Sequence, residues 1–278
     1  MGAEPFSEHA QRAARAYGAA ADHYDRAPLG FWDRFGAATV SRLGLNAGDR
    51  VLDLCCGAGA SALPAARAVG GRGRVTGVDI AEPLLAMARA RAAAGGLANV
   101  EFRCADAGRT GLPEAGFDAV VCVFGVFFAP DMAAFAGEMW RLVRPGGVLA
   151  LTVWGPGLFE PANTVFWQSV RETEPALFKS FNPWDEITTP EALRALFARA
   201  GTTTATAEPE AGEQRLDRPD DFWDVVLGSG YRATVDALSA DKRASLRDRV
   251  LGELRARDVT ALRTDVIYGT ARRAVTLE

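Results

Sequence analysis

The sequence predicts a doubly wound α/β fold, in which helices cover both faces of a mostly parallel seven-stranded sheet. Two observations lead to this prediction. Between residues 50 and 154, short apolar runs alternate with alanine-rich stretches that are long enough for helices. Gly, Asp and Pro residues mark the ends of these runs. Near-continuous apolar strands separated by helices of about 10 to 15 residues are typical of parallel sheets buried on both faces.

The elements of this central region can be assigned in order. The predicted strands are residues 50–55, 74–80, 100–106, 118–124 and 148–154, and the predicted helices are residues 61–69, 82–95 and 131–144. Pro145, Gly146 and Gly147 predict a tight turn that leads into the fifth strand. Residues 49–154 are therefore the predicted core of the sheet.

The flanking regions carry weaker patterns. Residues 1–48 predict an N-terminal helical lid of two helices, with a break near Pro28-Leu29-Gly30. Two stretches are expected to be cap insertions, namely 155–189, which is dense in Pro and aromatic residues, and the largely helical 210–260. A helix over 190–201 and a strand over 202–210 lie between them, and 262–275 predicts the last strand. No repeat or linker divides the chain, so we expect a single domain over 1–278.

Composition excludes several classes of protein. The 278 residues carry a net charge of −4 and no Lys/Arg cluster, which argues against a nucleic-acid partner. No apolar run approaches the roughly 20 residues that a membrane span requires. The N-terminal stretch carries acids and histidines and lacks the apolar region of a signal peptide.

The cysteines do not predict a metal site. Their spacing contains no CxxC pair, and the chain has only two histidines, both far upstream of the cysteines. We therefore expect no metal, and we interpret the cysteines as reduced thiols of a cytoplasmic protein. The residues concerned are Cys55, Cys56, Cys104, Cys122, His9 and His23.

The stretch DLCCGAGASA, which follows the first strand, predicts a loop around a nucleotide-like ligand. Gly57 and Gly59 would allow the backbone to approach the ligand closely. Asp79 ends the second strand, where its carboxylate can accept hydrogen bonds from both ribose hydroxyls. The loop also satisfies the dinucleotide fingerprint G-x-G-x-x-[GA], so an NAD(P)-dependent oxidoreductase stays open at this point.

Three further features favour a different cofactor. Asp106 stands at the end of the third strand and is suited to accept from an adenine amine. Pro145-Gly146-Gly147 precedes the fifth strand, and a long N-terminal segment precedes the first strand. With these motifs, the chain resembles class I S-adenosylmethionine-dependent methyltransferases from about Tyr24 to Trp154. DLCCGAG and the upstream HYDRAPLGFWDRF are similar to the ubiquinone/menaquinone-biosynthesis group and its small-molecule relatives. Where Cys55 stands, the wider class usually has glycine, whereas the menaquinone-type enzymes share the Cys-Cys pair.

The resemblance implies S-adenosylmethionine as cofactor, S-adenosylhomocysteine as product, and a role for each matching residue. It places Asp53, Cys55, Gly57 and Gly59 around the methionine part of the cofactor and Asp79 on its ribose. Around the adenine it places Ile80 on one face and Asp106 and Ala107 at the amine. Phe124 is expected near the sulfonium, and Tyr24 in the lid. The residues themselves leave simpler roles open. Asp53 and Asp106 could be turn or helix caps, Phe124 a core residue, and Tyr24 an ordinary residue of an amphipathic helix.

The methyl acceptor is expected to be a small apolar or aromatic molecule. Candidate pocket residues are the aromatic ones outside the motifs, with core packing as the alternative for each: Trp32, Phe127, Phe128, Trp154, Phe159 and Trp167. A general base is needed only if the acceptor must lose a proton. The candidates are His23, Glu160, Asp185 and Glu186, and none is indicated strongly. The sequence does not determine whether O, N or C is methylated, which pathway the enzyme serves, or the oligomeric state, for which a homodimer is one option. It also leaves open that the chain is a cofactor-binding module without turnover.

Overall fold

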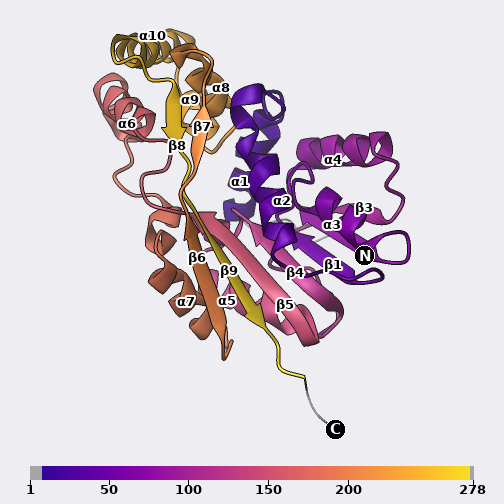
Figure 1. The fold of residues 1–278 in the computed structure, drawn as a ribbon. Coiled ribbons are helices and arrows are strands. Elements are labelled where there is room, and N and C mark those ends of the chain that lie inside the picture. The colour runs from indigo at the N-terminus through magenta and orange to yellow at the C-terminus, as the bar shows by residue number, and fades with distance from the viewer. Residues whose placement is uncertain (1–7, 276–278) are drawn as a thin grey trace.

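A seven-stranded sheet forms the centre of the computed structural model, which describes residues 8–275 (Figure 1). The strand order is β3-β2-β1-β4-β5-β9-β6. The first five strands are parallel to one another, and β9 is antiparallel to both of its neighbours. The predicted doubly wound α/β fold is confirmed. The strands are β1 (Arg50–Leu54), β2 (Arg74–Asp79), β3 (Val100–Cys104), β4 (Phe117–Val123), β5 (Val143–Trp154), β6 (Ala205–Glu210) and β9 (Val266–Arg272).

The strand order reverses on either side of β1. From β1 the chain steps outward to β2 and β3, and it then crosses back to β4 on the opposite side of β1. Asp53 of β1 lies opposite Gly77 of β2 and Val121 of β4. In such sheets the crevice outside the carboxyl ends of the strands, at the reversal point, is the usual ligand site.

Helices cover both faces, which explains the near-continuous apolar strands. Leu52 points into one hydrophobic cluster, which also contains Leu196 and Met139, whereas Val51 points into a second cluster with Ala62 and Val69. Side chains that alternate along a strand face opposite ways, so both faces need apolar residues. The covering helices are α2 (Phe31–Ser41) and α3 (Ala62–Val69) on one face and α5 (Met132–Leu142) and α7 (Pro190–Arg199) on the other, while α4 (Glu82–Ala94) packs on β3.

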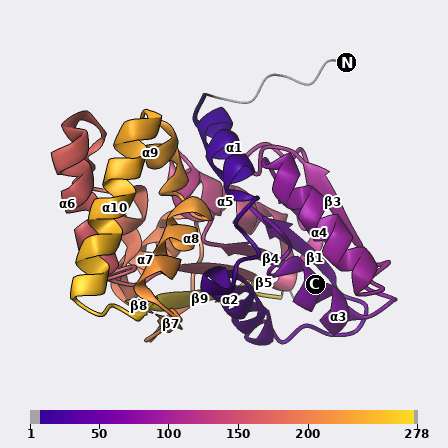
Figure 2. The same cartoon turned by 90° about the horizontal axis from the view of Figure 1, so that it is seen from above.

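The N-terminal segment contains two helices of different character. The predicted break is present as the 3-10 helix η1 (Ala27–Leu29) between α1 (Glu8–Ala20) and α2. α2 belongs to the core, because Phe31 and Phe35 are fully buried and Thr39 Oγ1 lies 2.7 Å from Thr152 Oγ1. α1 instead lies over the end of the sheet, between α4 and the helices of the C-terminal half (Figure 2).

The second half of the chain builds a helical subdomain beyond the end of the sheet (Figure 1). It consists of α6 (Ala162–Thr173), α8 (Phe222–Leu227), α9 (Arg232–Asp236), α10 (Ala240–Ala256) and a small sheet of β7 (Glu213–Arg215) and β8 (Ala261–Arg263). Helix α6 lies inside the stretch 155–189, for which the sequence predicted no regular element. Its proline and aromatic content obscured a helix whose face packs on α10.

Two predictions about strand ends were wrong. The expected last strand, 262–275, is two strands, because β8 pairs with β7 whereas β9 pairs with β5 and β6. Between them the Thr264 N–H donates to the Gly212 carbonyl, 2.8 Å away, and the Asp265 carbonyl accepts from Gly155 at 2.7 Å, so this stretch is bonded to loops. Pro145-Gly146-Gly147 does not precede the fifth strand but forms an irregularity within it, because Val143 already pairs with Phe117.

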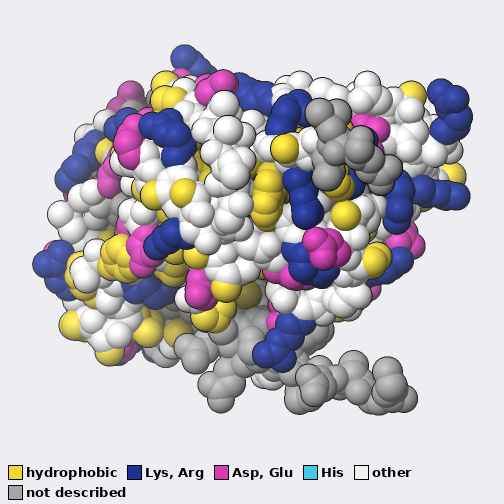
Figure 3. Space-filling model, turned by 90° about the horizontal axis from the view of Figure 1, so that it is seen from below, with side chains coloured by type: hydrophobic (Ala, Val, Ile, Leu, Met, Phe, Trp, Pro, Cys, Tyr) yellow, Lys and Arg dark blue, Asp and Glu magenta, His cyan; other side chains and the backbone are white. Residues whose placement is uncertain are grey.

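The surface seen from below carries acidic and basic side chains close together (Figure 3). None of the helices within residues 8–275 is both long and apolar enough to cross a membrane.

Candidate active site

A cavity of about 460 Å³ opens at the carboxyl ends of β1 to β4, where the strand order reverses. Its volume lies within the range of about 300–1,000 Å³ that is usual for small-molecule sites. The predicted residues that line it are Tyr24, Cys55, Gly57, Asp79, Ile80, Asp106, Ala107 and Phe124, together with Trp32 and Phe128. The fold therefore brings together residues from four strand ends and from the N-terminal segment.

The loop after β1 turns sharply because several of its residues have positive φ. Cys55, Gly57 and Gly59 have φ values of 60°, 50° and 87°. At Cys55 this backbone conformation favours glycine, which explains why glycine is common at this position in the class that the sequence resembles. A hydrogen bond of 3.1 Å from the Cys56 N–H to the Val78 carbonyl ties the loop to β2.

The two glycines of this loop serve different purposes. Gly57 lines the cavity, and a Cβ added there would lie 3.3 Å from the Tyr24 hydroxyl. Gly59 does not line the cavity, and a Cβ added there would come within 3.0 Å of Leu63 Cγ. The expectation that Gly59 allows close approach of a ligand is therefore not met, since this glycine allows helix α3 to pack on the loop.

Asp79 is fixed at the end of β2 by backbone donors. Its Oδ2 accepts the Gly57 N–H at 2.8 Å, and its Oδ1 accepts the Ala81 N–H at 2.9 Å. Burial raises the pKa of Asp79, and these backbone hydrogen bonds oppose the rise. Each carboxylate oxygen has a second lone pair, so the side chain can still accept hydrogen bonds from a ligand in the cavity.

Asp53 lies behind the cavity wall. It is buried, and its Oδ2 accepts a hydrogen bond of 2.6 Å from the Ser61 hydroxyl, while Ser61 itself lines the cavity. Burial raises the pKa of Asp53 to about 7, although the Ser61 hydrogen bond opposes this shift. Its Oδ1 is buried without a hydrogen-bond partner. A buried acceptor of this kind is costly unless a bound group satisfies it.

The loop after β3 supplies the next part of the wall. Asp106, Ala107 and Gly108 line the cavity, and Asp106 Oδ1 accepts the Gly108 N–H at 2.9 Å. Asp106 thus closes its own turn, as one of the sequence alternatives proposed, and also borders the cavity.

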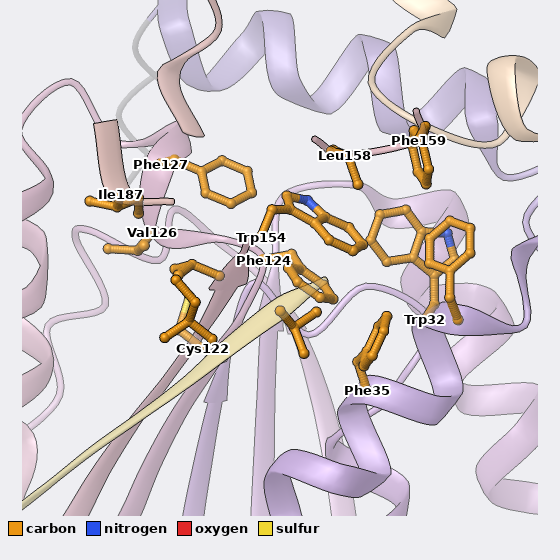
Figure 4. Close-up of a cluster of buried hydrophobic side chains, with 14 of the residues drawn as sticks. Trp32, Phe35, Cys122, Phe124, Val126, Phe127, Trp154, Leu158, Phe159 and Ile187 are labelled. Carbon is orange, nitrogen blue, oxygen red and sulfur yellow. The ribbon is translucent and has the colours of Figure 1, made fainter. Parts of the chain in front are cut away.

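Phe124 occupies a strained position just after β4. Its φ is 55°, and its N–H donates to the Thr152 carbonyl at 2.9 Å. Phe124 lines the cavity, and its ring stacks on Trp154 with the ring centroids 3.7 Å apart (Figure 4). Left-handed conformations at non-glycine residues often mark functional sites.

The N-terminal segment closes the opposite side of the cavity. The rings of Tyr24 and Trp32 are parallel, with centroids 5.7 Å apart, and both line the cavity. Tyr17 of α1 also lines it and packs edge-on against Phe128 at 5.3 Å. We call Ala13, Tyr17, Tyr24 and Trp32 the N-terminal wall.

Four of the six aromatic residues proposed for the acceptor pocket do not line this cavity. They lie in the hydrophobic core, where Trp154 and Phe159 pack among Phe31, Trp32 and Phe124 (Figure 4). These four residues therefore pack in the core, which was the alternative role that the sequence left open for each of them. The four residues are Phe127, Trp154, Phe159 and Trp167.

None of the general-base candidates lines the cavity. His23 Nδ1 lies 2.7 Å from Asp22 Oδ1, and its Nε2 lies 3.8 Å from Asp224 Oδ1, so His23 contacts the helical subdomain. Glu160 accepts hydrogen bonds from two residues of α6, and Asp185 accepts from the Asn182 N–H in its own turn. Glu186 borders a separate surface hollow near Phe181.

Sequence reasoning missed several residues of the cavity wall. A helical spacing of three and four residues could have grouped those on α1 and around the start of α5, but the same spacing describes any buried helix face. Nothing in the sequence pointed to Ser61 except its place in the loop DLCCGAGASA. The missed residues are Ala13, Tyr17, Cys56, Ala60, Ser61, Leu84, Gly108, Arg109, Val123, Gly125, Ala129, Pro130, Asp131, Ala134, Phe135 and Glu138.

The wall fits S-adenosylmethionine in its chemistry. Asp53 does not line the cavity, but its unpartnered Oδ1 behind Ser61 suits an ammonium group that is reached through water. Asp79 offers acceptors for ribose hydroxyls at the end of β2. Gly57 lines the cavity without a side chain, next to the Tyr24 hydroxyl.

Comparison with known proteins agrees with this chemistry. Residues 51–147 match the family model described as a methyltransferase domain. The aklanonic acid methyltransferase DauC of Streptomyces sp. (strain C5) is 32% identical over 192 residues, which cover 65% of this chain and 87% of that protein. The nocamycin O-methyltransferase of Saccharothrix syringae is 28% identical over 247 residues, which cover 84% of this chain and 87% of that protein.

Two further likenesses concern the motif region and the fold. A demethylmenaquinone methyltransferase of Geobacillus kaustophilus is 36% identical over 121 residues, which cover 43% of this chain and 52% of that protein. The phosphoethanolamine N-methyltransferase 2 of Haemonchus contortus, solved with S-adenosyl-L-methionine, has a TM-score of 0.59 at 19% identity and covers 97% of this chain and 60% of that one. With its sheet order, its glycine loop and these relatives, the chain belongs to the class I S-adenosylmethionine-dependent methyltransferases.

Proposed function

We propose that this enzyme transfers a methyl group from S-adenosylmethionine to an oxygen atom of a small, acidic and largely apolar acceptor. The observation that carries the proposal is the cavity at the reversal of strand order, in which Asp79 and the glycine loop face an aromatic N-terminal wall. The alternative of an NAD(P)-dependent oxidoreductase is not favoured by the relatives, which are named methyltransferases.

We assign the cofactor roles as follows. Asp79 would hold the ribose hydroxyls, Asp53 and Ser61 the ammonium group, and Ile80 and Asp106 the adenine. The bound cofactor supplies a methyl group that is already activated on a sulfonium. Tyr24, Trp32 and Phe124 would exclude water from that end of the cavity and hold the acceptor in line, which can account for most of the rate.

The proton inventory of the cavity supports an acceptor that arrives ionised. Of the carboxylates in its wall, Asp131 caps helix α5 and Glu138 is paired with Arg141, while Asp79 and Asp106 have the cofactor roles above. The pKa of the Cys55 thiol is raised well above its usual value by its hydrogen bond to Cys122 and by burial, so this thiol stays protonated. A carboxylic acid or an acidic phenol needs no base at neutral pH.

A melting experiment tests the cofactor. At one hundred times their Kd, S-adenosylmethionine and S-adenosylhomocysteine should each stabilise the folded protein by about 2.7 kcal/mol and so raise its Tm. NAD(H) should leave the Tm unchanged. Stabilisation by NAD(H) alone would overturn the assignment.

A methylation assay tests the acceptor class. Purified enzyme with methyl-labelled cofactor is given matched panels of aromatic carboxylates, phenols of graded acidity, and quinols. We expect label on oxygen, with rates that rise as the acceptor pKa falls. Label on a quinol ring carbon would instead support the runner-up, C-methylation of a quinol, which the demethylmenaquinone methyltransferase likeness suggests.

We also propose that the enzyme acts in the cytoplasm. The four cysteines are all free thiols, as a reducing compartment would keep them, although Cys55 and Cys122 are neighbours. Fractionation of the native host with an antibody to the chain would test this.

A further inference from the structure

The two aromatic residues of the N-terminal wall that stack on each other are each followed directly by an aspartate. Asp25 follows Tyr24, and Asp33 follows Trp32. Tyr24 precedes η1 whereas Trp32 lies in α2, so the two aspartates come from separate elements. Neither aspartate lines the cavity, and both side chains are 60% exposed.

A single arginine binds both aspartates. Arg91, near the end of α4, contacts Asp25 Oδ1 through Nη2, and its Nη1 lies 3.1 Å from Asp33 Oδ1. The same Nη1 donates to the Ala58 carbonyl at 3.2 Å, between the two glycines of the cofactor loop. Only 26% of the Arg91 side chain is exposed. One guanidinium thus joins the N-terminal wall to the glycine loop.

This arrangement suits the guanidinium group. Its planar fork of donors can serve several acceptors at fixed angles, which a lysine ammonium on a flexible stem cannot reproduce. An exposed ion pair contributes little by itself, but three contacts on one partly buried group act together. Tyr24 also sits over Gly57, so a shift of the segment between Tyr24 and Trp32 would change the space at the cofactor loop.

We propose that Arg91 is a positioning residue, which holds Tyr24 and Trp32 against the glycine loop and thereby sets the affinity for S-adenosylmethionine. The inference rests on the proposed function. When a binding-competent arrangement is only partly populated, the apparent Kd rises in inverse proportion to its population. Saturating cofactor restores that arrangement, so the loss of Arg91 acts on KM for the cofactor more than on kcat.

The test compares Arg91→Ala with Arg89→Ala. Arg89 lies on the same helix and bonds Glu82 and the Phe102 carbonyl, with no described contact to the N-terminal segment. We expect Arg91→Ala to raise the Kd for S-adenosylhomocysteine and the KM for S-adenosylmethionine about tenfold, with kcat within about threefold of wild type. Arg89→Ala should change neither constant.

Two further readouts separate positioning from a general loss of fold. Amide hydrogen exchange over residues 21–34 of the cofactor-free protein should speed up in Arg91→Ala and not in Arg89→Ala. Asp25→Asn should weaken cofactor binding in the wild-type background and have no further effect in the Arg91→Ala background. Arg91→Lys, which keeps the charge, should recover only part of the affinity.

The outcomes are distinct. Unchanged exchange and unchanged Kd in Arg91→Ala would overturn the inference, as would equal effects in Arg89→Ala or a fall in kcat without a change in KM. A failure of the proposed function would show itself differently, as a wild-type protein that binds no S-adenosylhomocysteine while the exchange difference persists.

Discussion

The cavity has two walls that are held in place by different means. Strand ends form the motif wall, and the backbone holds them: Cys56 N–H bonds the Val78 carbonyl, and Ala105 N–H bonds the Asp79 carbonyl at 3.0 Å. The N-terminal wall depends on side chains, namely the rings of Tyr17, Tyr24 and Trp32 and ion pairs such as Arg232 with Asp22, 3.2 Å apart.

This contrast between the two walls indicates where the affinity of the site for its ligand can be adjusted. Changing the motif wall requires changing the sheet, whose register is fixed by many hydrogen bonds along the strands. In the N-terminal wall, Trp32 is anchored in the core helix α2, but the segment that carries Tyr24 is held by side-chain contacts, several of which lie at the surface. We therefore expect variants of the motif wall to affect binding chemistry directly and variants of the N-terminal wall to act through position.

The largest effect should come from the buried acid of the motif wall. The folded pKa of Asp53, about 7, lies above its unfolded value, so the folded state binds the extra proton between about pH 4 and pH 7. Binding of this proton stabilises the folded state by up to about 4 kcal/mol below that window. This stabilisation is lost as the pH rises through the window. Relative to Asp53→Asn, the wild-type protein should lose stability from pH 4 to pH 7, as measured by denaturant unfolding.

Calorimetry tests whether the proton on Asp53 is released when the cofactor binds. An ammonium group near Asp53 favours its ionised form, so binding of S-adenosylmethionine near pH 6 should release a proton in the wild type and less in Asp53→Asn. Binding enthalpies that do not depend on the ionisation enthalpy of the buffer would contradict the role given to Asp53.

The next effect compares two helix glycines. A Cβ at Gly36 in α2 would lie 2.3 Å from the Ala60 carbonyl oxygen, whereas a Cβ at Gly18 in α1 would meet only Pro83 at 3.7 Å. Gly36→Ala should destabilise the protein by about 3 kcal/mol through overpacking against the cofactor loop. Gly18→Ala should stabilise it by about 0.5–1 kcal/mol through its helix propensity. Thermal and urea unfolding give both values, and equal losses would show that α1 is packed as tightly as α2.

Asp79→Ala tests the ligand-facing side of the motif wall. We expect cofactor binding to weaken by about 1.5–3 kcal/mol, because hydrogen bonds to a charged group are lost. Glu82→Ala, an exposed acid at the start of α4, is the matched control. Calorimetric affinities that are the same for both variants would remove Asp79 from the site.

The smallest effect concerns Cys55. Replacement by glycine relieves its positive φ but increases the freedom of the unfolded chain, and each term is about 1 kcal/mol. Cys55→Gly should therefore leave the free energy of unfolding within about 1 kcal/mol of wild type. Cys55→Val should destabilise the protein measurably, because a β-branched residue tolerates this conformation poorly. If valine is tolerated as well as glycine, backbone strain does not explain the preference at this position.

Prediction from the sequence succeeded where a local pattern determines structure. The strands 50–55 and 74–80 were located within one residue of β1 and β2, because an apolar run bounded by Gly and Asp has few alternatives. Asp79 and Gly57 reach the cavity because Asp79 ends β2 and Gly57 follows β1, and the carboxyl ends of these strands meet at one edge of the sheet. The S-adenosylmethionine-dependent methyltransferase family was identified correctly on the same motifs.

Prediction failed where packing between distant segments decides. Phe127 and Phe128 are neighbours of identical chemistry, yet Phe128 lines the cavity and Phe127 does not. His23 is next to Tyr24, but it contacts Asp224 of the helical subdomain. The stretch 262–275 has the composition of one strand, but its two halves pair with different partners.

Local sequence patterns were sufficient to predict the sheet, the glycine loop, the carboxylates at the strand ends and the family, because these depend on short-range spacing and on the hydrogen-bond register of parallel strands. Three features are visible in the folded protein alone: Asp53 lies behind Ser61, Tyr17 and Trp32 close the cavity, and Arg91 joins its two walls. Such contacts unite residues far apart in the chain, and their geometry follows from how whole helices pack, which no local spacing encodes.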